Sequence, residues 1–128
     1  MLMEILIKKK ALLSALAGAK AASPNEFICL FTGKREKGNI LIEDTIIPAG
    51  VMVSETMSSF SDWMMPVHPG SVGTFHSHPN ASSRPSRQDR WLFSKKGGVH
   101  FIASEPFDVE SVSVYFGNGK KADFRVID

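Results

Sequence analysis

Short apolar segments separated by turn signals limit this chain to folds built around a β-sheet. Residues 26–32 form a nearly continuous apolar run of the length that is typical of a buried strand. Similar segments predict strands at residues 40–47, 51–55, 71–77, 99–104, 111–115 and 122–127, with a solvated turn at 33–39, a short helix and loop at 58–70, and a hairpin turn at Asn118 and Gly119. The sequence therefore predicts a sheet of many short strands.

Two helices are expected to accompany these strands. The first should end near Ala22, because Pro24 disfavours a helical conformation in the residue before it. A second helix is expected from Ser86 to about Lys96, where two glycines follow. Strands and helices together predict an α/β (α+β) fold, a mixed sheet with two main helices in one domain that spans residues 1–128. The apolar stripe expected on the first helix consists of Ile5, Leu12, Leu13, Leu16 and Ala19.

Length and composition exclude several classes of protein. The chain has 128 residues, the size of one domain, with 43% hydrophobic and 22% charged residues, which argues against disorder. No apolar stretch reaches the roughly 20 residues that a membrane-spanning helix needs. The formal net charge of +2 is too small to indicate a nucleic-acid-binding surface. We therefore expect neither a membrane nor a nucleic acid as a partner.

The single cysteine, Cys29, cannot form an internal disulfide and lies in an apolar strand segment. This position favours a core residue over a nucleophile. A lone cysteine also fits a reducing compartment, so we expect a cytoplasmic protein. Residues 1–19 resemble a secretory signal as well, but Glu4 precedes every basic residue, and an amphipathic helix accounts for the same residues.

Two histidines lie at the end of the strand predicted at residues 71–77. Side chains alternate along a strand, so His76 and His78 leave the same face and can reach one point in space. Asp89 follows in the first turn of the next predicted helix. Two imidazoles and one carboxylate form a common catalytic zinc set, in which a fourth position is left to water. The spacing thus indicates a candidate metal site.

These residues also have structural interpretations. A histidine pair on a strand can simply be solvated or hydrogen-bonded. Ser86 and Asp89 have the S-x-x-D spacing of a capping box, in which Asp89 folds back onto the start of the helix. The two interpretations compete for the carboxylate of Asp89. His68 and His100 lack partners at ligand spacing, so we expect His68 in a loop and His100 in a strand.

Together, the segments H-S-H-P and S-R-Q-D, with seven residues from Pro79 to Pro85, resemble the JAMM (MPN+) family of zinc metalloproteases. The family signature is H-x-H, about seven residues, then S-x-x-D, with a glutamate far upstream. Glu26, between the first helix and the first strand, is similar to that glutamate. The resemblance covers most of the chain and is greatest for small stand-alone archaeal and bacterial members. It implies one JAMM domain with a curved mixed sheet similar to the cytidine-deaminase-like fold.

The resemblance also implies a role for each motif residue. Glu26 would act as general base and then as general acid, and Ser86 would donate a hydrogen bond to the oxyanion. One Zn²⁺ ion, which activates a water molecule, would be held by His76, His78 and Asp89. The family has a substrate-contacting insertion in the region that here contains Trp63, Met64 and Met65. These three residues are weak candidates for substrate binding, and packing in the core is their alternative interpretation.

The resemblance implies an isopeptidase that cuts after the C-terminal Gly-Gly tail of ubiquitin or a ubiquitin-like protein. The nearest alternative is the processing of a sulfur-carrier protein tail, which small relatives carry out. A non-catalytic interaction module with a structural zinc ion is an alternative of a different class. A zinc deaminase is disfavoured because the sequence has no P-C-x-x-C motif.

The helix expected after the motif carries several basic side chains. They form either a solvated face or a surface for an acidic partner, and they are Arg84, Arg87, Arg90, Lys95 and Lys96.

Overall fold

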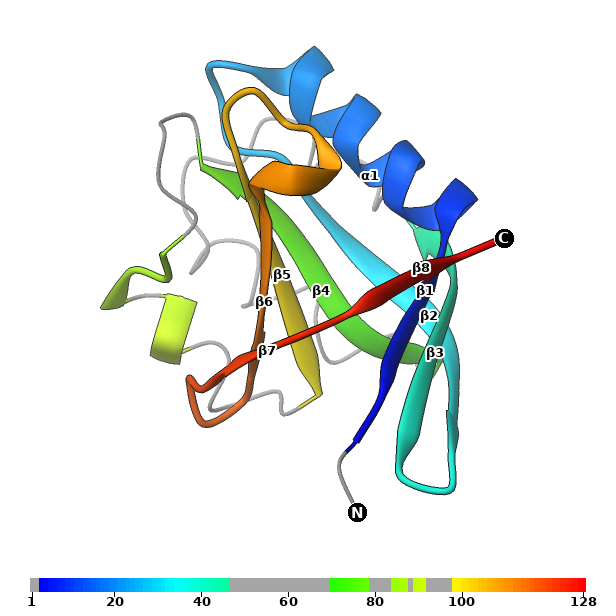
Figure 1. The fold of residues 1–128 in the computed structure, drawn as a ribbon. Helices are drawn as coiled ribbons and strands as arrows, with labels where there is room; N and C mark the ends of the chain where they lie inside the picture. The colour runs from blue at the N-terminus through cyan, green and yellow to red at the C-terminus, as the bar shows by residue number, and fades with distance from the viewer. Residues whose placement is uncertain (1–2, 47–69, 79–83, 88, 92–97) are drawn as a thin grey trace.

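The structure is a computed structural model that describes residues 3–46, 70–78, 84–87, 89–91 and 98–128. In this part of the chain, eight strands form one curled mixed sheet in the order β7-β6-β5-β4-β2-β3-β1-β8, and helix α1 packs on it (Figure 1). The elements are β1 (Ile5–Lys8), α1 (Lys9–Ala22), β2 (Ile28–Glu36), β3 (Asn39–Ile46), β4 (Ser71–His78), β5 (Val99–Ser104), the 3-10 helix η2 (Val109–Ser111), β6 (Val112–Phe116), β7 (Lys121–Ala122) and β8 (Arg125–Ile127). The predicted α+β class is confirmed.

The N-terminal segment contains a strand that the sequence analysis took for part of the first helix. In β1, Ile5 is buried and pairs with β3, while α1 begins only at Lys9. Leu13, which was expected on the buried stripe of α1, is 46% exposed. The predictions for Ile5 and Leu13 were therefore wrong, because a few apolar residues fit a period of 2 and a period of 3.6 equally well. The predicted end of the helix at Ala22 is confirmed.

The hairpin of β2 and β3 is longer than the sequence predicted. The charged residues 34–36 continue β2, and only Lys37 and Gly38, both with positive φ angles of 50° and 82°, form the turn. The end of the hairpin is exposed to water, so polar side chains are compatible with strand pairing there. The turn predicted over residues 33–39 was thus too long, since charge was taken as a loop signal.

Strand β4 pairs in opposite directions with its two neighbours. It runs antiparallel to β2 and parallel to β5, so the carboxyl ends of β4 and β5 lie at the same edge. The connection from α1 to β2 and the segment that follows β5 lie at that end of the sheet as well (Figure 1). Three separate parts of the chain therefore gather around the end of β4, which carries the two histidines.

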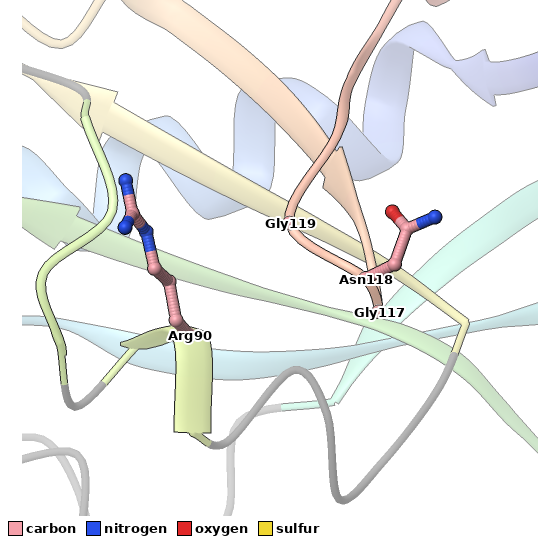
Figure 2. Close-up of a pocket in the computed structure, with 4 residues that line it drawn as sticks. All are labelled: Arg90, Gly117, Asn118 and Gly119. Carbon is pink, nitrogen blue, oxygen red and sulfur yellow. The ribbon is translucent and has the colours of Figure 1, made fainter.

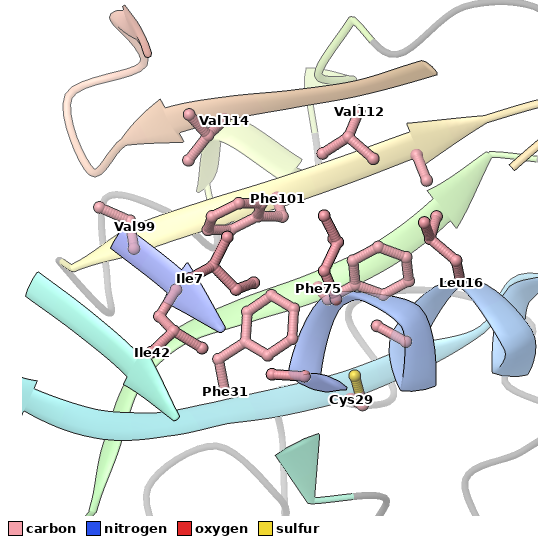
Figure 3. Packing of buried hydrophobic residues seen from close by; sticks show 14 of the residues in the cluster. Ile7, Leu16, Cys29, Phe31, Ile42, Phe75, Val99, Phe101, Val112 and Val114 are labelled. Carbon is pink, nitrogen blue, oxygen red and sulfur yellow. The ribbon is translucent and has the colours of Figure 1, made fainter. Parts of the chain in front are cut away.

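Aromatic side chains form the centre of the core between the sheet and α1. Phe31 makes edge or tilted contacts with Phe75 and Phe101, at ring-centroid distances of 5.9 and 5.2 Å. Leu16 of α1 packs in the same cluster, and so does Cys29, as Figure 3 shows. Such offset aromatic packing stabilises the core beyond the burial of apolar surface. This rigid layer lies directly beneath β4.

The C-terminal segment differs from the single strand predicted at residues 122–127. The structure has two short strands, β7 and β8, on opposite edges of the sheet, and Phe124 between them packs on Phe101 at 5.3 Å. The first four residues of β6 are all buried. The strand predicted at 51–55, the helix and loop predicted at 58–70 (apart from Gly70) and most of the helix from Ser86 lie outside the described residues. Within the described residues, no helix has both the length and the apolar character to span a membrane.

Candidate metal centre and active site

The two histidines on β4 lie at its carboxyl end and face the same side of the sheet. The side chain of His76 is completely buried, whereas that of His78 is 13% exposed. Their Nε2 atoms are 3.2 Å apart. This pair is therefore fixed by the central strand and reachable from solvent only at His78.

Asp89 meets the histidines from a separate segment, in which residues 87 and 89–91 are helical. Its carboxylate is 2% exposed and spans both rings. Oδ1 lies 3.1 Å from Nε2 of His76, and Oδ2 lies 3.0 Å from Nε2 of His78. In the described part of the chain, this is the group of metal-ligating side chains whose ligand atoms all lie within 4.8 Å of one another.

The donor atoms of this cluster fit a divalent cation. Zinc bonds to histidine nitrogen and carboxylate oxygen are about 2.0–2.2 Å long, so tetrahedral ligand atoms lie about 3.3–3.6 Å apart. The separations of 3.0–3.2 Å among His76, His78 and Asp89 are close to these values. Two imidazoles and one carboxylate also match the ligand types that zinc prefers, and they leave a coordination position unfilled by protein. The residues present thus fit a catalytic zinc ion.

Ser86 and Asp89 form the predicted capping box as well. The backbone N–H of Ser86 donates to Oδ2 of Asp89 at 2.7 Å, and the backbone N–H of Asp89 donates to Oγ of Ser86 at 3.1 Å. The sequence analysis treated capping and metal binding as competing uses of the Asp89 carboxylate. In the structure the same carboxylate accepts the cap hydrogen bond and faces both rings, because it has enough lone pairs for both.

The neighbours of Asp89, above all the two histidines, also fix its charge. Burial raises the pKa of this carboxyl, but hydrogen bonds from the His76 and His78 rings and from the Ser86 backbone outweigh burial and hold the pKa well below its usual range. Asp89 is therefore ionised under ordinary conditions. An ionised, hydrogen-bonded carboxylate is oriented before any cation binds.

Glu26 lies beside this cluster at the start of the pairing between β2 and β4. Ile28 pairs with His76, so the antiparallel register brings Glu26 opposite His78. The side chain is half-buried, and burial raises the pKa of its carboxyl, although the charges of His76 and His78 lower it. A carboxyl with a raised pKa next to a candidate metal site is suited to accepting and returning a proton.

Comparison with known proteins identifies the family. A family model described as prokaryotic homologues of the JAB domain matches residues 8–115 of the chain. The chain belongs to this family. The resemblance to small prokaryotic JAMM/MPN proteins is thus confirmed, and the matched residues of this JAB domain include both histidines, Asp89 and Glu26.

Individual relatives agree with this assignment. A Haloferax volcanii protein named "Probable metalloprotease" is 27% identical over 95% of this JAB domain and 79% of its own length. A JAB1/MPN domain protein from Archaeoglobus fulgidus has 30% identity and a TM-score of 0.73, with 95% of this chain and 98% of that chain covered. A structure described as "JAMM: A Metalloprotease-like Zinc Site in the Proteasome and Signalosome" has 30% identity and a TM-score of 0.72 over the full length of both chains.

A protein from Desulfitobacterium hafniense shares the fold alone. Its identity is 22% and its TM-score 0.69, with 97% of this chain and 93% of that chain covered. The agreement in fold and family supports a metalloprotease with a JAMM-type zinc site.

Other residues singled out in the sequence lie elsewhere in the JAB domain. His100 lies in β5 as predicted, and its Nδ1 is 2.8 Å from Oγ1 of Thr74. Arg84, Arg87 and Arg90 are exposed. Outside the described residues lie His68, Lys95, Lys96 and the substrate-binding candidates Trp63, Met64 and Met65.

A separate hollow of about 250 Å³ lies between the helical segment at 89–91 and the turn after β6. Its described lining is Arg90, Gly117, Asn118 and Gly119, and Figure 2 shows Arg90 and Asn118 on these two elements. Among its described lining residues, none belongs to the candidate metal cluster.

Cys29 is buried in the core, as the sequence predicted, and burial raises the pKa of its thiol. The thiol therefore ionises only in the unfolded protein, where its pKa is about 8.5. Above that pH, ionisation stabilises the unfolded state, so the free energy of unfolding falls as the pH rises. We expect the free energy of unfolding of the wild type to fall, relative to Cys29→Ala, by about 2 kcal/mol between pH 7 and pH 10. Urea titrations of both proteins across this range measure the difference. A constant difference would contradict a buried neutral thiol.

Proposed function

We propose that this JAB domain, residues 1–128, is a zinc-dependent peptidase that cleaves after the C-terminal Gly-Gly tail of a ubiquitin-like protein. The observation that carries this proposal is the convergence of His76, His78 and Asp89 within 4.8 Å beside the half-buried carboxyl of Glu26. Three protein ligands with a neighbouring carboxyl are the parts that metal-assisted hydrolysis of an amide requires.

The role of each residue follows from its surroundings. When bound by His76, His78 and Asp89, zinc supplies a Lewis acid and lowers the pKa of water to about 7. Glu26 accepts the proton of the attacking water and returns it to the departing amine. The hydroxyl oxygen of Ser86 accepts a hydrogen bond from the backbone N–H of Asp89. The hydroxyl proton of Ser86 is thus left to donate to the developing oxyanion.

The burial of the site supports a substrate with a slender backbone at the scissile bond. His76 and Asp89 are almost inaccessible, and only His78 is partly exposed. A chain that ends in two glycines can approach such a site closely, because glycine has no side chain. The family resemblance supports a ubiquitin-like protein as the carrier of this tail, with Trp63, Met64 and Met65 as candidate contacts. A sulfur-carrier protein of similar fold presents the same tail chemistry.

A panel of fusion proteins tests the proposal. Each fusion joins a ubiquitin or sulfur-carrier protein through its Gly-Gly end to a leaving peptide or to a lysine amine. We expect cleavage after the second glycine, its loss with a zinc chelator, and its recovery when zinc is added back. A control fusion whose terminal Gly-Gly is replaced by Ala-Val should stay intact.

The same panel distinguishes the alternative of a non-catalytic module. If no fusion is cleaved, and chelation unfolds the protein, zinc has a structural role and the proposed peptidase is wrong. Circular dichroism of the protein with and without chelator measures whether it unfolds. Cleavage of sulfur-carrier fusions alone would assign the substrate to that class.

A further inference from the structure

A side chain interrupts the hydrogen-bond ladder between β2 and β4 next to the candidate site. The backbone N–H of Ser77 donates to the carbonyl of Phe27 at 2.9 Å, as expected for an antiparallel pair. The backbone N–H of Phe27, however, donates to Oγ of Ser77, also at 2.9 Å. Both residues are completely buried. Ser77 thus holds both polar groups of the Phe27 backbone, one with its own N–H and the other with its hydroxyl.

The ring of Phe27 is fixed from two further directions. It packs edge-on against Phe75 with the ring centroids 6.2 Å apart. The outer end of the ring lies against Gly18 of α1, where even a single methyl group would collide with it. Because the interior is tightly packed, Phe27 can shift only if α1 or β4 moves as well.

The two hydrogen bonds between Ser77 and Phe27 form an anchor that lies next to the proposed catalytic base and the proposed ligands. Glu26 directly precedes Phe27, and Ser77 lies between His76 and His78 on β4. A single pair of residues therefore connects the backbone of the base to the strand that holds two ligands. The side chain of Ser77 points away from the metal cluster, because it alternates with those of His76 and His78.

We propose that Ser77 is a positioning residue, whose hydroxyl fixes Glu26 relative to the two histidines through the backbone of Phe27. The inference rests on the proposed peptidase function and deepens it. Without the hydroxyl, the buried N–H of Phe27 has no acceptor in its present position, so the peptide plane between Glu26 and Phe27 has to rotate. A displacement of about 1 Å at a catalytic group can cost about 100-fold in rate.

Ser77→Ala tests this role, because it removes the acceptor without adding volume. We expect kcat to fall by about 10- to 100-fold with KM and the zinc stoichiometry unchanged. Ser77→Thr keeps the hydroxyl and should restore most of kcat, and Ser77→Cys, with a weak sulfur acceptor, should give an intermediate value. The matched control is Ser71→Ala on the same strand, which loses a hydrogen bond to Gly73 and should keep the wild-type kcat.

A double-mutant cycle separates positioning from general destabilisation. If Ser77 acts through Glu26, Ser77→Ala should lower the residual kcat of Glu26→Gln by less than twofold. The proposal would be overturned if the fold-decreases in kcat of the two single variants multiply in the double variant, or if Ser77→Ala loses zinc. If Ser77→Ala does not fold, the same cycle with Ser77→Cys decides the question.

Amide hydrogen exchange gives a readout that does not depend on activity. We expect the Phe27 amide to be protected in the wild type and to exchange roughly 10-fold faster in Ser77→Ala, with the amides of β5 unchanged. Equal exchange in both proteins would refute the anchor. If the wild type cleaves no fusion while the Phe27 amide behaves as expected, the proposed function fails and the anchor stands. If the wild type is active but the cycle is additive, only the role of Ser77 fails.

Discussion

Glu26→Gln is expected to lower kcat by roughly 10²- to 10⁴-fold while the protein still binds zinc. Glutamine has nearly the same shape as glutamate but cannot accept a proton at neutral pH. Glu26 lies next to the cluster of His76, His78 and Asp89 but is not one of its three donor residues. Kinetics on a cleavable Gly-Gly fusion, together with zinc analysis of the purified variant, measure both parts of the prediction.

The control for this variant is Glu36→Gln, which makes the same chemical change at an exposed position at the far end of β2. It should leave kcat, KM and zinc content unchanged. Full activity in Glu26→Gln would remove Glu26 from the reaction. Loss of zinc in that variant would instead make Glu26 a ligand, and the division of roles between base and ligands would be wrong.

The sequence allowed much of the candidate site to be predicted, because its geometry depends on local rules. Alternation along one strand brings His76 and His78 to the same face, and helix capping directs Asp89 back toward the start of its segment. The link between the α1–β2 connection and β4 could not be derived in this way. It depends on strand pairing between residues 50 positions apart in the chain. For the same reason, sequence reasoning gave Ser77 no role beyond the spacing of the two histidines.

The errors in the predicted fold occurred where long-range pairing overrides local pattern. Ile5 fits a helix by its spacing, but β1 is held in place by parallel partners on both sides, β3 and β8. Phe124 was predicted inside one strand, yet it packs on Phe101 while the chain crosses to the other edge of the sheet. Neither contact has a local sequence signal, whereas β5 was predicted with its observed bounds because burial on both faces favours a short, mostly apolar run.

Asp89→Asn is expected to abolish zinc-dependent cleavage, with a loss of roughly 10³-fold or more, because it removes the anionic ligand. The amide oxygen of asparagine can still accept the hydrogen bond from the Ser86 backbone, so the capped segment should persist. Zinc titration followed by thermal unfolding measures the effect. Zinc should raise the Tm of the wild type and leave that of Asp89→Asn unchanged, since a ligand stabilises only the state that binds it.

A second capping box in the same chain provides a matched control. Asp108 accepts from the backbone N–H of Ser111 at 3.0 Å, in a capping box in which the aspartate and the serine have exchanged positions relative to Ser86 and Asp89. Asp108 is not part of the cluster formed by His76, His78 and Asp89. Asp108→Asn should therefore keep zinc binding and cleavage intact. If both variants lose zinc equally, the loss comes from helix capping. If Asp89→Asn binds zinc as tightly as the wild type, Asp89 is not a ligand, and the two histidines need a different third partner.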